Sequence, residues 1–179
     1  GNMSITRAYA VDEIKPLSTQ YWFYECHYLE SFDAANFNTS YTKDMGAMFE
    51  ECWSLKSLDL HSFDTSNVTS MASMFYDCNK LESLNISGFN TSNVVYFTYM
   101  FYECGKLQEL NLSSFDTSNA TELYCMFSDC ESLEELDLSS FHTPKLKTGY
   151  AGMDNLFEGC SSLKKLNLSN FDTDRKSVV

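Results

Sequence analysis

Cysteine recurs at a fixed interval along this chain. Five cysteines lie 26 residues apart and a sixth follows after 30; they are Cys26, Cys52, Cys78, Cys104, Cys130 and Cys160. One residue type on an unbroken period indicates an internal repeat. A chain of such repeats folds as a stack of similar units, a solenoid, and its stacked surfaces usually serve binding rather than catalysis.

Aligned on cysteine, the units share a strand-like pattern. The second and third units contain MFEECWSLKSLDLHSFDTSNVTSM and MFYDCNKLESLNISGFNTSNVVYF. Two apolar residues two positions apart, with polar residues beside them, are typical of the buried face of a strand. The pairs are Phe32/Ala34, Leu58/Leu60, Leu84/Ile86, Leu110/Leu112, Leu136/Leu138 and Leu166/Leu168. One strand per unit predicts a parallel sheet along one face of the stack.

Before each cysteine the apolar spacing changes. Met71, Met74, Phe75 and Cys78 stand at i, i+3, i+4 and i+7, which is the spacing of one helix face. We therefore predict a short helix in each unit, joined to the strand by a corner of sequence SxFDTSN. The expected organisation is an N-terminal cap or linker at residues 1–20 and a solenoid of about six repeats at residues 21–179.

The repeated cysteines are expected to be buried free thiols. In-register side chains of a parallel stack point the same way, whereas a disulfide requires Cβ atoms that face one another. Cys125 is out of phase with the other cysteines, and we expect it near solvent. The 14 phenylalanines form two columns, meaning sets at the same position of successive units, or replace other apolar core residues. The pattern thereby assigns all of them to the core.

Composition argues against several classes of partner. Lys and Arg number 12 and Asp and Glu 25, a formal net charge of −13. This charge argues against nucleic acid and anionic membranes as ligands. No apolar run approaches the roughly 18 residues of a membrane-spanning helix, so no membrane span is expected.

The sequence shows no catalytic or metal-binding arrangement. His27, His61 and His142 lie in different columns, and no CxxC, GxSxG or HExxH motif occurs. We therefore predict no catalytic residues, no metal site, no cofactor and no enzyme activity. One column of carboxylates precedes the cysteines: Glu25, Glu51, Asp77, Glu103 and Asp129. Stacked carboxylates could invite calcium, but single columns lack the multidentate loop of a tight site.

Two surfaces are candidates for binding. The first is a polar column on the predicted strands, made of Asp33, Asp59, Asn85, Asn111, Asp137 and Asn167. It is either a solvated face bonded from unit to unit or a strip that binds glycan or peptide. The second is a tyrosine patch on the predicted helix side, made of Tyr96, Tyr99, Tyr102 and Tyr124. Clustered tyrosine is typical of protein interfaces, and packing between neighbouring helices is the alternative.

The consensus MFxxCxxLxxLxLSxFDTSNVTxM resembles the BspA-like leucine-rich repeats, in the 26-residue form met in bacterial surface proteins, over residues 21–179. The resemblance implies an α/β leucine-rich repeat solenoid, with a parallel β-sheet on one face and short helices on the other. It also implies a cell-surface or secreted location and adhesion, and it supplies no catalytic residues. We expect a non-enzymatic protein that binds a host or matrix protein; the alternative is a glycan-binding module using the strand face. Exposed solenoid ends would allow self-association.

Overall fold

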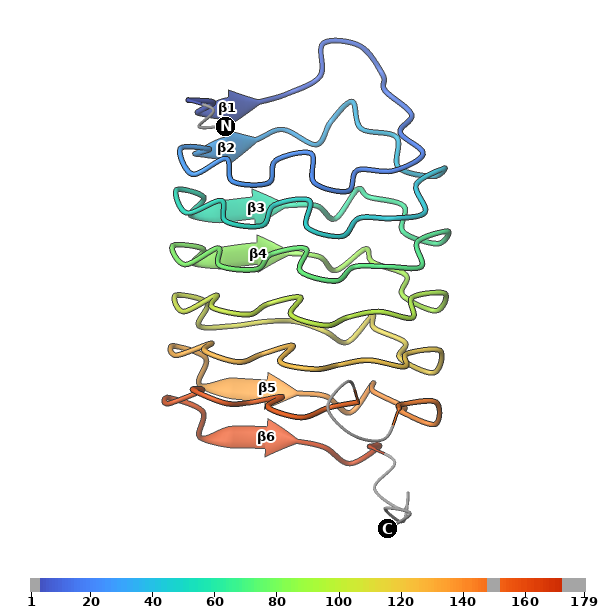
Figure 1. Ribbon diagram of the computed structural model, residues 1–179, viewed down its shortest axis with the longest axis vertical. Helices are drawn as coiled ribbons and strands as arrows, with labels where there is room; N and C mark the ends of the chain where they lie inside the picture. The colour runs from blue at the N-terminus through green and yellow to red at the C-terminus, as the bar shows by residue number, and fades with distance from the viewer. Residues whose placement is uncertain (1–3, 148–151, 172–179) are drawn as a thin grey trace.

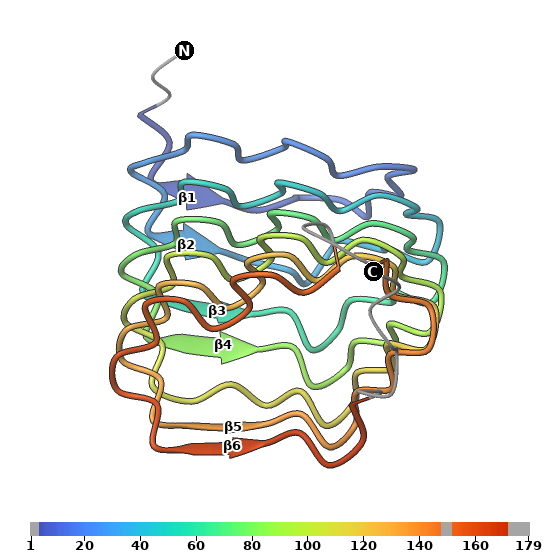
Figure 2. The ribbon, with the colours of Figure 1, turned by 60° about the horizontal axis from the view of Figure 1, so that its bottom comes forward.

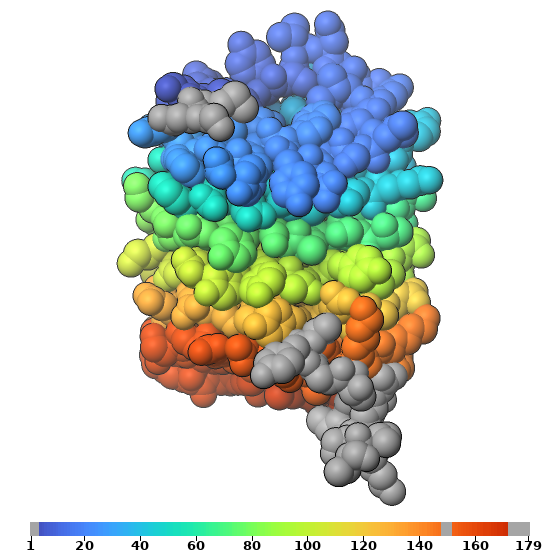
Figure 3. All heavy atoms as spheres, viewed as in Figure 1, coloured from blue at the N-terminus to red at the C-terminus, as the bar shows by residue number. Residues whose placement is uncertain are grey.

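The protein is a stack of similar rungs running from the N-terminal to the C-terminal end (Figure 1). The computed structural model describes residues 4–147 and 152–171. Residues 1–3 of the predicted cap, residues 148–151 in the longer interval before Cys160, and residues 172–179 at the predicted end of the solenoid lie outside the described residues. The rungs pack closely on the face shown in Figure 3.

The strands are short and lie on one face of the stack (Figure 2). They are β1 (Arg7–Ala8), β2 (Ser31–Phe32), β3 (Ser57–Asp59), β4 (Ser83–Asn85), β5 (Glu135–Asp137) and β6 (Lys165–Asn167). They form three separate parallel pairs, β1 with β2, β3 with β4 and β5 with β6. Leu58 lies opposite Leu84 and Leu136 opposite Leu166, so equivalent residues of successive repeats are in register.

The N-terminal segment lies along the first repeat. Arg7 is in register with Ser31 through the β1–β2 pair. Further along, Ile14 forms a parallel bridge with Phe37. The Thr19 N–H donates to the Asp44 carbonyl at 3.0 Å. Residues 7–20 therefore follow the path of a repeat without carrying its sequence pattern.

The predicted helices are wrong. The described residues contain no helix, so the fold is a solenoid of short strands and turns rather than an α/β solenoid. Before each cysteine, alternate N–H groups have different partners. Met74 donates within its own turn to the Met71 carbonyl at 3.2 Å. Ser73 donates to the Thr98 carbonyl of the next rung, at 2.9 Å. The same alternation occurs in the first five repeats. A helix would require all these N–H groups to bond within the segment.

Left-handed residues make this backbone possible. In each repeat two residues four positions apart have positive φ; the pairs are Tyr21/Glu25, Ala47/Glu51, Ser73/Asp77, Tyr99/Glu103, Cys125/Asp129 and Asn155/Gly159. A positive φ at the third residue of a turn is what a type II turn requires. The succession of turns places Met71, Met74, Phe75 and Cys78 inward, all fully buried. The apolar spacing therefore identified the buried side chains correctly and the backbone wrongly, because consecutive turns and a helix share that spacing.

This backbone predicts an unusual response to glycine. Ser73 has φ 56°, a conformation that costs an L-residue roughly 1–2 kcal/mol. We expect Ser73→Gly to leave the free energy of unfolding unchanged or to raise it by up to about 1 kcal/mol, because glycine relieves that cost. In a helix the same change would lower stability by roughly 0.5 kcal/mol. Urea denaturation checks the result, with Ala72→Gly, at an ordinary φ next door, as the control expected to destabilise. A loss of stability in Ser73→Gly would contradict the turn structure.

The core is one continuous apolar cluster along the stack. Phe75 stacks between Phe49 and Phe101, with ring centroids 6.1 and 5.7 Å apart. A column of buried threonines lines the SxFDTSN corner. The Thr65 hydroxyl donates to the Asn90 carbonyl at 2.9 Å and accepts the Asn90 N–H at 2.8 Å. The corner sequence therefore joins one rung to the next instead of capping a helix.

The cysteine column also bonds successive rungs. The Cys78 thiol donates to the Phe49 carbonyl at 3.1 Å, and the same oxygen accepts the Cys52 N–H at 3.1 Å. Burial raises the pKa of Cys78 to about 12. All seven cysteines are free thiols. The expectation that Cys125 lies near solvent is wrong: it is 4% exposed, because it occupies a turn position between the rungs of Tyr99 and Asn155. Cys160 is the partly exposed cysteine.

Thiol reactivity should follow this burial. The thiolate is the reacting species, so buried cysteines with raised pKa values react slowly. We expect Ellman's reagent at pH 8 to modify no more than one thiol per native chain, at Cys160, and all seven after unfolding in guanidinium chloride. Peptide mass spectrometry identifies the labelled residue. Rapid native labelling of Cys78 or Cys104 would show that the column is open to solvent.

Candidate functional site

The strand-face residues are largely used by their own turns. Asp33, Asp59, Asn85, Asn111 and Asp137 are exposed and Asn167 is half-buried. In each of the six, a side-chain oxygen accepts the N–H of the residue two positions later, at 2.8–3.3 Å. A hydrogen bond from His61, at 2.9 Å, is the main cause that lowers the pKa of Asp59, and Asn85 of the next rung contributes a smaller effect. The column therefore combines bonds within a rung with contacts between rungs.

The strand face is interrupted in the fourth repeat. Among the described residues, segment 108–112 makes no main-chain hydrogen bond to the rung on either side. Charge accompanies the break: Glu109 and Glu135 occupy one column, and like charges in neighbouring strands destabilise pairing. On the other side of β5, Glu135 pairs with Lys165 at 2.9 Å and Glu134 with Lys164 at 3.2 Å, where the β5–β6 pairing is complete.

A hollow of about 690 Å³ lies at this interruption. We call it the strand-face hollow; it is lined by Gln108, Glu109, Leu110, Asn111, Glu134, Glu135, Leu136, Asp137, Lys165 and Asn167. Three of the six predicted strand-face residues line it, whereas Asp33, Asp59 and Asn85 lie outside it. Sequence reasoning missed the hollow, although the glutamates sharing a column were a signal for it.

The tyrosines interlock on the opposite, turn face. Tyr76 and Tyr102 stack at a centroid distance of 4.8 Å, and Tyr99 meets Tyr102 and Tyr124 edge to face at 5.5 and 5.2 Å. We call Tyr76, Tyr99, Tyr102 and Tyr124 the tyrosine cluster. All four members are half-buried. Tyr96 lies outside the cluster: it is 43% exposed and forms parallel bridges with Ser70 and Glu122. The structure thus joins three of the four predicted patch residues and adds Tyr76.

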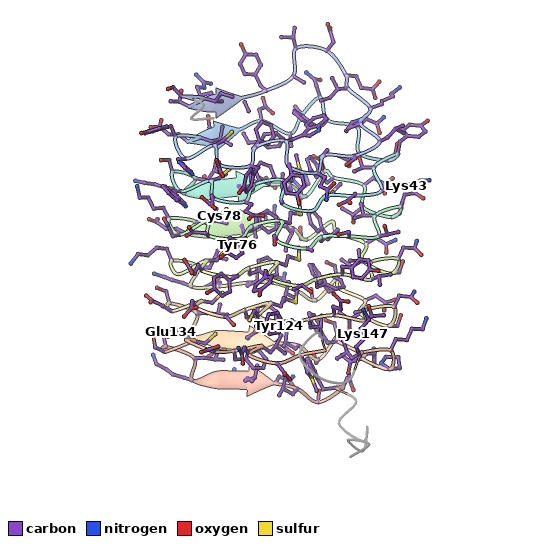
Figure 4. The ribbon with its side chains drawn as sticks, in the orientation of Figure 1. Lys43, Tyr76, Cys78, Tyr124, Glu134 and Lys147 are labelled. Carbon is purple, nitrogen blue, oxygen red and sulfur yellow. The ribbon has the colours of Figure 1, made fainter. Side chains whose placement is uncertain are left out.

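Figure 4 places Tyr76 and Tyr124 between the two corners of the stack, with Glu134 toward one corner and Lys43 and Lys147 toward the other. Three phenols of the cluster have raised pKa values, and burial is the main cause for Tyr76. Burial and the Glu103 charge raise the pKa of Tyr102 to about 12. Hydrogen bonds with Cys125 and Tyr99 raise the pKa of Tyr124. The neutral forms of Tyr76, Tyr102 and Tyr124 are therefore favoured.

Carboxylates border the tyrosines. Glu25, Glu51, Asp77, Glu103 and Asp129 are half-buried at left-handed turn positions beside the cluster's columns. Burial, followed by the charge of Asp77, raises the pKa of Glu103. Among the described residues, no group of three or more His, Cys, Asp or Glu side chains is arranged to hold a metal ion. The described residues also contain no helix with the length and hydrophobicity that crossing a membrane requires.

The carboxyl group of Glu50, next to Glu51 of this column, should make stability depend on pH. Burial and the charges of Glu51 and Glu25 raise the pKa of Glu50 to about 6, from 4.5. Because the folded state binds this proton more tightly, the stabilisation is present below pH 4.5 and is lost as pH rises through 6. We expect Glu50→Gln to stabilise the protein at pH 7 by roughly 1 kcal/mol and to have little effect at pH 4. Thermal unfolding across pH 4–8 measures this, with Glu82→Gln on the strand side as the control for loss of one charge. An equal effect of Glu50→Gln at both pH values would contradict it.

Comparison with known proteins identifies the family. The family described as "Mycoplasma protein of unknown function, DUF285" matches residues 17–135 and 85–178. The chain belongs to this family. The repeats described above thus make up the DUF285 region, and the BspA-like pattern remains a resemblance.

Two further comparisons add little. No curated protein matches the chain. A crystal structure of a leucine-rich repeat protein from Bacteroides ovatus ATCC 8483 shows 22% sequence identity over 87% of this chain, with a TM-score of 0.28. This chain covers 55% of the length of that protein. A likeness at that TM-score supports no conclusion about this DUF285 protein.

Proposed function

We propose that this DUF285 protein is a non-enzymatic binding protein that contacts a protein partner through its tyrosine cluster. The observation that carries the proposal is the continuous contact of four half-buried tyrosine rings on the turn face. Tyrosine combines a large apolar ring with a polar hydroxyl and is enriched at protein interfaces.

The fold does not require these rings. Tyr99 occupies the left-handed position that Ser73 and Ala47 fill in other repeats, with φ values of 59°, 56° and 55°. Positive φ is least favourable for bulky residues, so folding alone favours a smaller residue than tyrosine at this position. Tyr102 shares its column with Ser128, which again shows that a small side chain completes the turn. The aromatic residues therefore have a role beyond completing a rung.

Ring packing also prepares the cluster for binding. Each ring touches at least one other, so the side chains lose little conformational freedom when a partner covers them. A rigid aromatic surface is the usual centre of a protein interface. The resemblance to BspA-like surface proteins supports a cell-surface or secreted location and adhesion to a host or matrix protein.

Glycan binding at the strand-face hollow is the second candidate. Its specific support is that segment 108–112, among the described residues, makes no main-chain hydrogen bond to the neighbouring rungs and lies beside Asn111, Asp137 and Asn167. Sugar hydroxyls both donate and accept hydrogen bonds, so they match peptide groups and the amide or carboxylate side chains of this hollow. The volume of about 690 Å³ lies within the range of small-ligand sites.

The two candidates can be separated with variants taken from the repeat itself. Tyr99→Ser with Tyr102→Ser introduces the residues found at Ser73 and Ser128. For a ligand found on a panel of immobilised matrix proteins, we expect this variant to lose about 100-fold in affinity by surface plasmon resonance. Its melting temperature should change little, because the turn is complete without the rings.

The matched control is Tyr28→Ser with Tyr41→Ser, which removes two tyrosines that are 52% and 56% exposed elsewhere. This control should bind like the wild type. Equal affinity of the Tyr99/Tyr102 variant and the wild type would refute the proposed site. Loss of binding to a glycan array in Gln108→Ala with Glu135→Ala would establish the strand-face hollow instead.

A further inference from the structure

The main-chain hydrogen bonds between the rungs of the turn face all point the same way. In each of them the N–H belongs to the earlier rung and the C=O to the later one, as in the bond from Ser73 to Thr98 at 2.9 Å. Four such bonds join each pair of successive rungs, from residues 19–25 through to residues 152–158. The direction of these bonds therefore distinguishes one end of the stack from the other.

The bonds form continuous chains of peptide groups. The Ala72 carbonyl accepts the N–H of Ala47, and the N–H of the same peptide unit, which belongs to Ser73, donates to Thr98. The peptide dipoles of successive rungs are aligned head to tail, as they are along a helix. Aligned peptide groups polarise one another and leave partial positive charge at the N–H end and partial negative charge at the C=O end. The stack therefore has a polar axis along its length.

Donors end the stack on one side and acceptors on the other, at the opposite ends seen in Figure 1. In the last rung, four N–H groups that would continue the chains make no main-chain hydrogen bond among the described residues; they belong to Met153, Asn155, Phe157 and Gly159. In the first rung, the corresponding four C=O groups accept no main-chain hydrogen bond from any part of the chain that the structure describes; they belong to Ser18, Gln20, Trp22 and Tyr24. Unpaired main-chain groups in a row are a template for pairing with another chain. The two rows match in number, order and polarity.

Apolar side chains that are buried in the inner rungs are exposed at both ends. Leu168 is 40% exposed, whereas Leu138 in the same column is fully buried. Trp22 is 39% exposed, although Met48, its equivalent in the next rung, is fully buried. A matching rung at either end would remove this apolar surface from water, which is favourable.

We propose that the C-terminal end of the stack binds the N-terminal end of a second copy of this chain, in a head-to-tail contact that continues the solenoid. The four donors of one copy meet the four acceptors of the next, in the arrangement that joins successive rungs within the chain. Two C-terminal ends would bring donor against donor, and two N-terminal ends would bring acceptor against acceptor. Polarity therefore selects the head-to-tail contact over a symmetric dimer. Such a heterologous contact leaves one free end on each side, so it produces chains of copies.

The apolar columns also continue across this contact. Phe157 stacks on Phe127 at a centroid distance of 5.9 Å, and Phe23 stacks on Phe49 at 5.4 Å. In the head-to-tail contact, Phe23 of the second copy lies over Phe157, at the next step of the same column. The contact thus combines paired peptide groups with the aromatic stacking found inside the stack.

One charged column opposes the contact. Arg7 and Lys165 occupy the same strand position at opposite ends of the stack. Continued stacking places Arg7 of the second copy beside Lys165, and like charges in neighbouring strands destabilise pairing. The net charge of −13 adds repulsion between copies. Salt screens both effects, so the association strengthens as the salt concentration rises.

Sedimentation velocity of the intact chain measures the association. We expect the weight-average sedimentation coefficient to rise with protein concentration, and the apparent dissociation constant to fall at least about tenfold from low to high salt. Arg7→Glu should tighten the association at low salt, because the new carboxylate faces Lys165 of the other copy. The control is Lys80→Glu, the same charge change at an exposed position of an inner repeat, which should not tighten it.

Mixing two end-blocked variants tests the polarity. Met153→Glu with Leu168→Glu places charge at the C-terminal end, and Tyr21→Glu with Trp22→Glu places charge at the N-terminal end; all four side chains are exposed. Each variant should be monomeric by itself at concentrations where the wild type associates. The two variants together should form dimers that do not grow further, because one open end of each kind remains in the mixture.

Circular dichroism checks the folding of each variant, and the single changes Met153→Glu and Tyr21→Glu replace a double variant that does not fold. A wild-type chain that stays monomeric at every concentration and salt level refutes the proposal. Association of one end-blocked variant with itself would show a contact between like ends and would overturn the head-to-tail arrangement. None of these residues belongs to the tyrosine cluster, so the proposed function stands or falls separately.

Discussion

The stack depends on an alternation of main-chain hydrogen bonds in the turns before each cysteine. Every second N–H closes a turn within its rung, and the N–H groups between them reach the next rung, as Met74 and Ser73 illustrate. Buried peptide groups must be paired, and this arrangement pairs them in two directions at once. It holds the turn face together continuously through the first five repeats, whereas the strand face is divided into three separate pairs. The turns, more than the strands, fix the spacing of the rungs.

The same backbone determines what the surface displays. Two left-handed residues in each repeat are required for the turns, and the side chains at those positions are not part of the continuous apolar core. One such column carries Tyr99 and the other carries Glu103 and Asp129. Tyrosines and carboxylates are thereby brought side by side on a rigid framework. A binding site built on such a framework can change from repeat to repeat without altering the core.

Much of this could be predicted from the sequence, and the limits have physical causes. The period of 26 gave the solenoid, the register and the buried columns, because every repeat buries the same positions. The helices were wrong because the spacing of Met71, Met74, Phe75 and Cys78 describes a buried face without specifying the hydrogen bonds. The sequence carried no signal for the turns, because nearly all their left-handed positions hold residues other than glycine, and such residues seldom adopt a positive φ. Cys125 was misplaced because exposure at its turn position differs between repeats: the small thiol lies between the rungs of Tyr99 and Asn155 and is buried, whereas Tyr21 at the same position is exposed.

The candidate sites were harder to predict because they arise where the repeat departs from its own pattern. The strand-face hollow lies where Glu109 and Glu135 share a column and the pairing is interrupted. A second, smaller hollow, lined by Gly105 and Asp129 among others, lies where glycine occupies the position of Trp53. Neither departure stands out in a consensus, which averages the repeats and removes such differences. In a solenoid the repeated pattern builds the framework. Candidate binding sites are therefore expected where one repeat lacks a side chain or a strand pairing that its neighbour has. Asp77 and Asp129 differ in this way: Trp53 and Asn79 donate to the Asp77 carboxylate, whereas the Asp129 carboxylate lies against Gly159 of the next rung, where a side chain would leave it no room.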